Sequence, residues 1–240
     1  MEFFKNLDRI YCINLGHRKD RWTSCLQQFE NLGIADKVIR HEPKPCLLGS
    51  LSRKANAQAS CALAHYTLMT EALKSGCANT LILEDDFLFH RGAEWTNKKL
   101  LQGWSELPKD WDLFYLGAYF VHGYHYLPAL HFSKNLVRVK TGLCNHAVAY
   151  SRQGLNKILQ ELKLESEADL LNFSNEFEAI DWYMVRWFQT RGQCFAPNEL
   201  ACIQNPGQSD IEGQFWDYSS MFASSYQTHV MGMDSSNSVT

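Results

Sequence analysis

The feature that most constrains the fold is an alternation of short apolar runs with longer segments of helical periodicity. Residues 9–15 form a short apolar run, and residues 80–83 are apolar on both faces, as in the centre of a parallel sheet. Residues 57–75 carry one apolar stripe at helical spacing and are followed by Gly76, a typical helix stop. This alternation predicts an α/β fold with a mostly parallel central sheet and helices on both faces. The other expected strands span 37–41, 111–116, 136–140 and 146–150, and the other expected helices span 18–32, 94–106, 152–162 and 176–189.

Length and composition indicate a single domain. A chain of 240 residues suffices for one substantial α/β domain, and no repeat or linker divides it. We expect residues 1–218 to form this domain. Residues 219–240 are rich in Ser and Met and carry little charge, which predicts a flexible or lid-like tail.

Several function classes are disfavoured by composition and by missing motifs. A net charge of −3 gives no reason to expect nucleic acid as the partner. No apolar run approaches 18 residues, and the N-terminus lacks a secretory apolar core, so we expect a cytoplasmic protein without a transmembrane segment; peripheral membrane contact stays open. The eight cysteines are scattered without CxxC or zinc spacing and are expected to be buried hydrophobes. Walker-type and dinucleotide glycine motifs are absent, as is HExxH.

The strongest chemical signal is an acidic cluster at the end of the apolar run in TLILEDDF, residues 80–87. Because strand side chains alternate, Glu84 and Asp86 are expected on one face and Asp85 on the other. Ligands of open α/β sheets collect at the carboxyl ends of strands. Three adjacent carboxylates repel one another unless a cation offsets them, which favours a Mg²⁺ or Mn²⁺ site. The alternative is a solvated acidic turn.

The chain resembles glycosyltransferase family 25, which includes bacterial lipooligosaccharide galactosyltransferases and collagen hydroxylysine galactosyltransferases. The similar segments follow the family's order over residues 9–210. They are IYCINLGHRKDRW (10–22), SCALAHY (60–66), LILEDDF (81–87), WDLFYLG (111–117), NHAVAYSRQGLNKIL (145–159), IDWYM (180–184), Pro197, Gln204 and Ser209-Asp210.

The resemblance implies a GT-A type fold with a nucleotide-sugar half, residues 1–116, and an acceptor half, residues 117–218. It also implies a UDP-sugar donor, with galactose or glucose as the expected hexose, manganese at the acidic motif, and inversion at the anomeric carbon. The acceptor is left open among a glycan, a glycolipid and a hydroxylysine-type protein. This chain has Ala64-His65 where the family often has Ser-His, and the family includes inactive members.

Donor binding is assigned to residues near the first strand and the long helix. Asn14, Leu15, Arg18 and Arg21 lie at the first strand-to-helix turn, where amide donors and positive charge suit a diphosphate; an ordinary basic helix face is the alternative. The resemblance adds Ser60 and His65, for which a structural core role is equally open. Glu84 and Asp85 complete the expected donor site.

Catalytic and metal roles are assigned around Asp181. Its match to a family aspartate at the start of an apolar helix favours it as the base that takes the acceptor's proton, with Glu178 as the fallback; helix capping or a pair with Arg186 are the alternatives. Glu84 and Asp86 are expected to bind the metal. His146 is our choice as third ligand, with Asp210 and His229 as alternatives.

The aromatic segment 118–132 offers Tyr119, Tyr124 and Tyr126 for stacking on a sugar, or for packing under a loop. Two other functions stay open. Clustered carboxylates also serve two-metal phosphodiesterases, although no basic stripe accompanies them here. An inactive glycosyltransferase-like binding module would keep the same fold without turnover.

Overall fold

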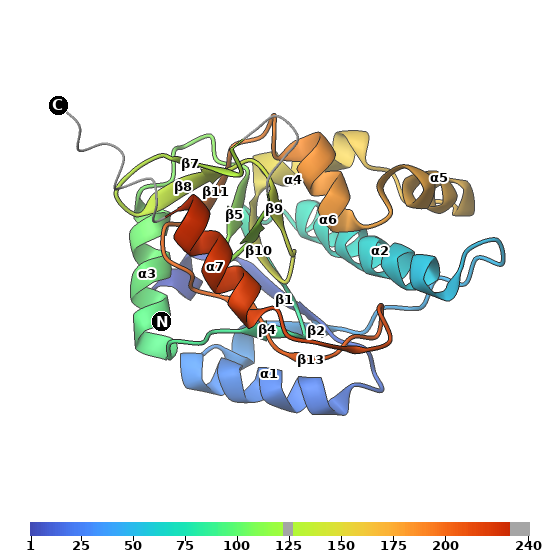
Figure 1. The fold of residues 1–240 in the computed structure, drawn as a ribbon, viewed down its shortest axis with the longest axis horizontal. Helices are drawn as coiled ribbons and strands as arrows, with labels where there is room; N and C mark the ends of the chain where they lie inside the picture. Colours follow the sequence, from blue (N-terminus) through green and yellow to red (C-terminus); the bar gives the residue numbers. More distant parts are fainter. Residues whose placement is uncertain (122–126, 231–240) are drawn as a thin grey trace.

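A single mixed sheet organises the computed structural model, which describes residues 1–121 and 127–230. Eight strands follow the order β2-β1-β3-β10-β5-β11-β8-β7 (Figure 1). They are β1 (Arg9–Ile13), β2 (Val38–His41), β3 (Asn79–Glu84), β5 (Leu113–Tyr115), β7 (Ala129–His131), β8 (Leu136–Val139), β10 (Ala147–Ser151) and β11 (Cys194–Pro197). Strands β10 and β8 run against the others. The predicted α/β class is therefore confirmed, with two strands reversed.

Helices cover both faces of this sheet (Figure 1). Helices α1 and α3 lie on one side, and α2, α4 and α6 lie on the other. The helices are α1 (Lys19–Leu32), α2 (Arg53–Lys74), α3 (Ala93–Ser105), α4 (Arg152–Glu161), α5 (Glu167–Phe177), α6 (Ile180–Tyr183) and α7 (Ser219–His229). Three short strand pairs among the described residues are β4 (Phe87–Leu88) with β12 (Ile203–Gln204), β6 (Tyr119–Phe120) with β9 (Gly142–Leu143), and β13 (Gly207–Gln208) with β14 (Phe215–Trp216).

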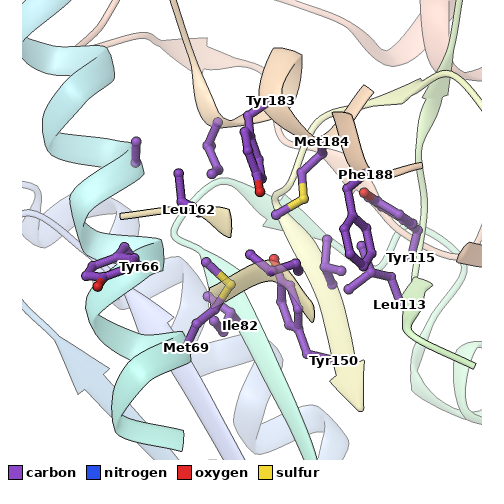
Figure 2. Packing of buried hydrophobic residues seen from close by; sticks show 14 of the residues in the cluster. Tyr66, Met69, Ile82, Leu113, Tyr115, Tyr150, Leu162, Tyr183, Met184 and Phe188 are labelled. Atoms are coloured by element: carbon purple, nitrogen blue, oxygen red, sulfur yellow. The ribbon is translucent and has the colours of Figure 1, made fainter. Parts of the chain in front are cut away.

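The two helix layers produce two apolar cores, one on each face of the sheet. Along β1, Ile10 and Cys12 belong to the core beneath α1 and α3, whereas Tyr11 and Ile13 belong to the core beneath α2. This period of two follows from the alternation of side chains along a strand. Figure 2 shows the second core, in which Met69 of α2 lies near Ile82 of the central strand β3. Both faces of β3 are thus buried, as its sequence predicts.

Local signals explain several helix boundaries. Helix α1 ends at Gly33, whose φ of 63° is in the left-handed region that favours glycine. The Ser52 side chain accepts a hydrogen bond from the backbone N–H of Ala55 and so caps the start of α2. Ser166 and Asp169 form a capping box at the start of α5.

The expected helix at 176–189 is wrong as a continuous element. Helix α5 begins earlier and ends at Phe177, and Glu178 follows with a φ of 64°. A short helix α6 and a π-helical turn, Met184–Phe188, come next. After this break, Asp181 lies in the first turn of α6, where its side chain accepts a hydrogen bond from the backbone N–H of Cys144.

The C-terminal segment also differs from the expectation. A flexible or lid-like tail is predicted over 219–240, whereas Ser219–His229 form α7. Phe222 and Tyr226 of α7 are buried, and Tyr226 packs on Phe120 with ring centroids 5.0 Å apart. Residues 231–240 lie outside the described residues, as do Tyr124 and Tyr126. Among the helices that the structure describes, none has the length and apolar character needed to cross a membrane.

Candidate active site

The acidic cluster lies at the carboxyl end of β3, beside the end of β1. Glu84 is the last residue of β3 and is paired in register with Ile13. Glu84 and Asp85 reach opposite helix layers: Glu84 contacts α2, and Asp85 contacts α1. This arrangement follows the predicted alternation of the strand.

Glu84 is held by the buried residue His65. The His65 ring Nε2 lies 2.8 Å from Glu84 Oε1, and the His65 side chain is fully buried. Burial acts to raise the pKa of Glu84, but the hydrogen bond and charge of His65, together with the charges of His146 and Arg21, outweigh burial and leave the pKa below its ordinary value. Cys61, one helical turn earlier on α2, places its Sγ 3.8 Å from Glu84 Oε1. The ligand atoms of Cys61, His65 and Glu84 all lie within 4.8 Å of one another, close enough to hold a metal ion.

Asp85 is paired with groups from the first strand-to-helix turn. Asn14 Nδ2 donates to Asp85 Oδ2 at 2.7 Å, and Arg21 Nη1 donates to Asp85 Oδ1 at 2.7 Å. Asn14 is itself buried and accepts hydrogen bonds from Arg40 through Oδ1. Asn14 therefore holds Asp85 in place through a hydrogen bond. It is not among the residues described as lining either cavity at the acidic cluster.

Asp86 is the least satisfied of the three carboxylates. Gln204 Nε2 donates to its Oδ2 at 2.9 Å, and Arg21 Nη1 lies 3.5 Å from the same oxygen. Its buried Oδ1 has no hydrogen-bond partner among the described residues. Burial and the nearby charge of Glu84 raise the pKa of Asp86 to about 7. Among the residues that the structure describes, Asp86 therefore shares its one positively charged partner, Arg21, with Asp85 and has an oxygen without a hydrogen bond.

Arg18 is engaged differently from Arg21. It forms ion pairs with Asp210 and Asp20 and donates to the carbonyl oxygen of Gln208 at 3.1 Å. Arg21 donates to the same carbonyl at 2.8 Å. The two arginines therefore tie the segment around Gln208 to the start of α1, and Arg18, unlike Arg21, is not among the residues described as lining either chamber.

Two joined chambers meet at the acidic cluster. The larger chamber, about 460 Å³, is bounded by Leu15, His17, Ser60 and the loop at Pro43–Pro45. The smaller chamber, about 320 Å³, is bounded by Asp181 and by aromatic side chains. The residues that line both are Arg21, Cys61, Glu84, Asp86, Gln204, Ser209 and Ile211. Both volumes are within the range of small-molecule sites.

Ser60 and Gly117 fix the walls of these chambers. Ser60 Oγ accepts the backbone N–H of Cys46 at 2.7 Å and donates to the carbonyl of Asn56, which anchors the Pro43–Pro45 loop region on α2. Gly117 packs directly against the chain at Cys202, because a Cβ at this position would overlap the Cys202 carbonyl oxygen. Only glycine allows this approach, which brings Gln204 to the acidic cluster.

Asp181 lies in the smaller chamber, at the start of α6. The backbone N–H of Cys144 donates to its Oδ2 at 3.0 Å. Burial and the charge of Glu84 raise the pKa of Asp181 to about 6. Arg186, the alternative structural partner, instead donates to the carbonyl of Glu176 at 3.2 Å. A half-buried carboxylate that shares a cavity with Glu84 and Asp86 is well placed to accept a proton.

Two sequence expectations are placed away from the chambers. Glu178, the fallback base, is exposed at the break between α5 and α6 and is not among the residues described as lining either chamber. His146 is fully buried, packs edge-on against Phe222 of α7 at 5.4 Å, and is likewise absent from the described cavity walls. Burial lowers the pKa of His146 to about 4. Both ring nitrogens of His146 are buried without a hydrogen-bond partner among the described residues, and its assignment as third metal ligand stays a prediction.

The remaining donor set fits a divalent cation. Glu84 and Asp86 both face the junction of the chambers, and the unpartnered Oδ1 of Asp86 is an oxygen ligand without a present role. Mg²⁺ and Mn²⁺ are bound by one or two carboxylates together with substrate phosphate oxygens and water. Cys61 and His65 add softer ligands on the α2 side.

Sequence reasoning offered Tyr119, which lines the smaller chamber, but missed the rest of its aromatic and amide walls. Trp182, Trp216 and Tyr218 line it, as do Gln58 and Asn145. Trp182 follows Asp181 directly within the segment IDWYM, which was a usable signal. The others come from segments without regular periodicity and are brought together only by the tertiary fold.

The cavities lie at the carboxyl end of β3, which is where open α/β sheets bind their ligands. No protein-family model matches it. Over 128 residues, 46% of this chain, it is 26% identical to procollagen galactosyltransferase 2 from Homo sapiens and 27% identical to procollagen galactosyltransferase 1 from Danio rerio. It is also 24% identical to a Homo sapiens protein named inactive glycosyltransferase 25 family member 3. These similarities confirm the resemblance to glycosyltransferase family 25.

The chain spans only about a fifth of the length of these relatives: 20% of the human galactosyltransferase and 21% of the Danio rerio protein. Among solved structures, it is similar to a glycosyltransferase involved in glycosylation of the major capsid of PBCV-1, with a TM-score of 0.43 and 10% identity over 85% of this chain and 95% of that one. Mannose-1-phosphate geranyltransferase from Thermus thermophilus has a TM-score of 0.45 and 10% identity over 79% of this chain and 72% of that one.

Proposed function

We propose that this chain is a glycosyltransferase that moves a hexose, galactose or glucose, from a UDP-sugar to an acceptor hydroxyl. The observation that carries the proposal is the convergence of Glu84, Asp86 and Asp181 on two joined chambers. The proposed base and the proposed cation-binding pair thereby line one chamber, and the pair also lines the second, as transfer between two substrates requires. The named activities of the similar galactosyltransferases support the same reaction class.

The larger chamber is assigned to the nucleotide. Leu15 and the prolines of the Pro43–Pro45 loop supply apolar surface for a uracil ring, and Ser60 holds that loop in place. Arg21 lies at the junction, where its guanidinium can meet a diphosphate while it neutralises Asp85. His65 keeps Glu84 ionised and oriented.

The smaller chamber is assigned to the acceptor and to the proton transfer. The acceptor hydroxyl donates its proton to the Asp181 carboxylate, and its oxygen forms a bond to the anomeric carbon of the hexose. The bond from that carbon to the UDP oxygen breaks on the opposite face, so UDP leaves with the bonding electrons and the configuration inverts. The raised pKa of Asp181 makes it a stronger base than an exposed aspartate.

The cation proposed here is Mn²⁺ or Mg²⁺, held by Glu84 and Asp86. When bound, such an ion stabilises the negative charge that develops on the departing diphosphate. The orphaned Oδ1 of Asp86 supports this role.

Turnover of defined donors tests the proposal. We would incubate the chain with Mn²⁺ and UDP-galactose, UDP-glucose or UDP-N-acetylglucosamine, and measure released UDP. UDP release from one hexose donor, absent in Asp86→Asn, is the expected result. A chain that binds UDP tightly without turnover would instead be a binding module, an outcome made relevant by the relative named as inactive. Cleavage of a phosphodiester without UDP release would overturn the proposal.

A further inference from the structure

The smaller chamber has aromatic side chains from four separate elements. They are Tyr119 of β6, Trp182 of α6, Trp216 of β14 and Tyr218 at the start of α7. Each is half-buried and lines the chamber. These four rings come from distant parts of the sequence and line the same chamber as Asp181, so the packing of a single element does not account for them.

The tryptophans of this wall are held in fixed positions. Trp216 stacks on Tyr218 with ring centroids 5.4 Å apart and an interplanar angle of 6°. Trp216 is also paired in register with Gly207 in the short β13–β14 ladder. The Trp182 ring is covered by the Arg186 guanidinium at 5.0 Å. Rigid rings lose little conformational freedom when a ligand stacks on them.

Uncharged amides complete the same chamber. Gln58, Asn145, Gln204 and Asn205 contribute to its wall. Asn145 is only 2% exposed, and its Nδ2 has no hydrogen-bond partner among the residues described. An unsatisfied buried donor costs stability unless a ligand supplies an acceptor. Side-chain amides both donate and accept, which matches the hydroxyl groups of a sugar.

We propose that the smaller chamber is an acceptor subsite for a saccharide, with one pyranose ring stacked on the Trp182 and Trp216 side of the wall. The inference rests on the proposed function, because it places the reacting sugar hydroxyl beside Asp181. A pyranose offers an apolar C–H face to an aromatic ring and hydroxyl groups at its edge. The chamber provides both kinds of partner. A peptide acceptor would use the amides but would leave the stacked aromatic wall without a role.

The experiment separates acceptor binding from donor binding. We would compare Trp216→Ala, Trp216→Phe and Trp182→Ala with Trp187→Ala, a control on the same helical segment whose exposed ring (41%) lies outside the chamber. The probes are lactose and methyl β-galactoside, with UDP as the donor-site probe. Saccharide binding would be measured by saturation-transfer NMR, and acceptor KM would be measured from UDP release with the preferred donor.

The two alanine variants at Trp182 and Trp216 are expected to weaken saccharide binding about tenfold, which corresponds to about 1.4 kcal/mol. UDP affinity should stay unchanged, and Trp216→Phe should recover most of the loss because it keeps a ring. Unchanged saccharide affinity in both alanine variants would overturn the inference, as would turnover of a hydroxylysine peptide without any saccharide binding. In both cases intact UDP binding would leave the proposed function standing. Failure of every protein, including the wild type, to bind UDP would instead refute the proposed function.

Discussion

The substitution Asp181→Asn should lower activity and raise stability, because the carboxylate is useful to catalysis and unfavourable to folding. The pKa of Asp181 is raised from 3.8 to about 6, first by burial. One pKa unit corresponds to about 1.36 kcal/mol, so the ionised group destabilises the folded chain by roughly 3 kcal/mol at neutral pH. Asparagine removes the charge and keeps an oxygen for the Cys144 N–H. We therefore expect Tm to rise by several degrees at pH 7.5.

The pH dependence fixes the sign of this effect. Since the folded-state pKa of Asp181 is the higher one, its cost is absent below about pH 4, grows between about pH 4 and 6, and is complete above about pH 6. The stability advantage of Asp181→Asn should therefore appear at pH 7.5 and vanish near pH 4. Differential scanning calorimetry at both pH values measures it.

The same variant tests the role of Asp181 as the base. Loss of a general base should reduce kcat by about 10²–10⁴-fold. At saturating Mn²⁺, which should keep Asp86 ionised, kcat/KM of the wild type should fall about tenfold per pH unit below about pH 6, and the variant should lose this limb. Glu178→Gln is the matched control, because Glu178 is an exposed carboxylate three residues away, and it should retain activity. An acid limb that persists in Asp181→Asn, or an activity loss accompanied by a lower Tm, would refute the reasoning.

Three further substitutions probe the surrounding contacts. Arg21→Met should cost about 3–5 kcal/mol in urea unfolding, because it strands buried carboxylates, whereas exposed Lys19→Met should be neutral; equal stability of the two variants would contradict the ion-pair assignment. Gly117→Ala should cost about 1–3 kcal/mol, since its Cβ meets a backbone carbonyl, and an unchanged Tm would argue against that close approach. Asp210→Asn should remove one of the two ion pairs of Arg18 and one negative charge from the larger chamber, and should tighten UDP binding two- to threefold, or about 0.5 kcal/mol, in calorimetry; weaker binding would show that the Asp210 carboxylate does not oppose the diphosphate.

Much of the sheet was predictable because its strands are short, apolar and bounded by clear turns. The direction of β10 was not, because an apolar run such as 146–150 has the same pattern in a parallel or an antiparallel pairing. The helix break at Glu178 also escaped prediction. Its left-handed backbone leaves little signal in a residue that is a good helix former elsewhere.

The site was predictable where it follows strand geometry and unpredictable where it depends on packing. Alternation along β3 correctly separates Glu84 from Asp85, since it depends only on the period of a strand. The contact of the His146 ring with α7 was not predictable, because α7 is formed by a segment of weak periodicity. Trp216 is placed in the aromatic wall by the short β13–β14 pair, which the local sequence pattern does not predict.

The central claim is that the joined chambers at the end of β3 bind a nucleotide diphosphate together with a divalent cation. Calorimetric titration of UDP with and without Mn²⁺, into the wild type and Asp86→Asn, tests it most directly. The account predicts that Mn²⁺ strengthens UDP binding to the wild type at least tenfold and has no such effect on Asp86→Asn. UDP binding that is absent from the wild type, or equally sensitive to Mn²⁺ in both proteins, would contradict it.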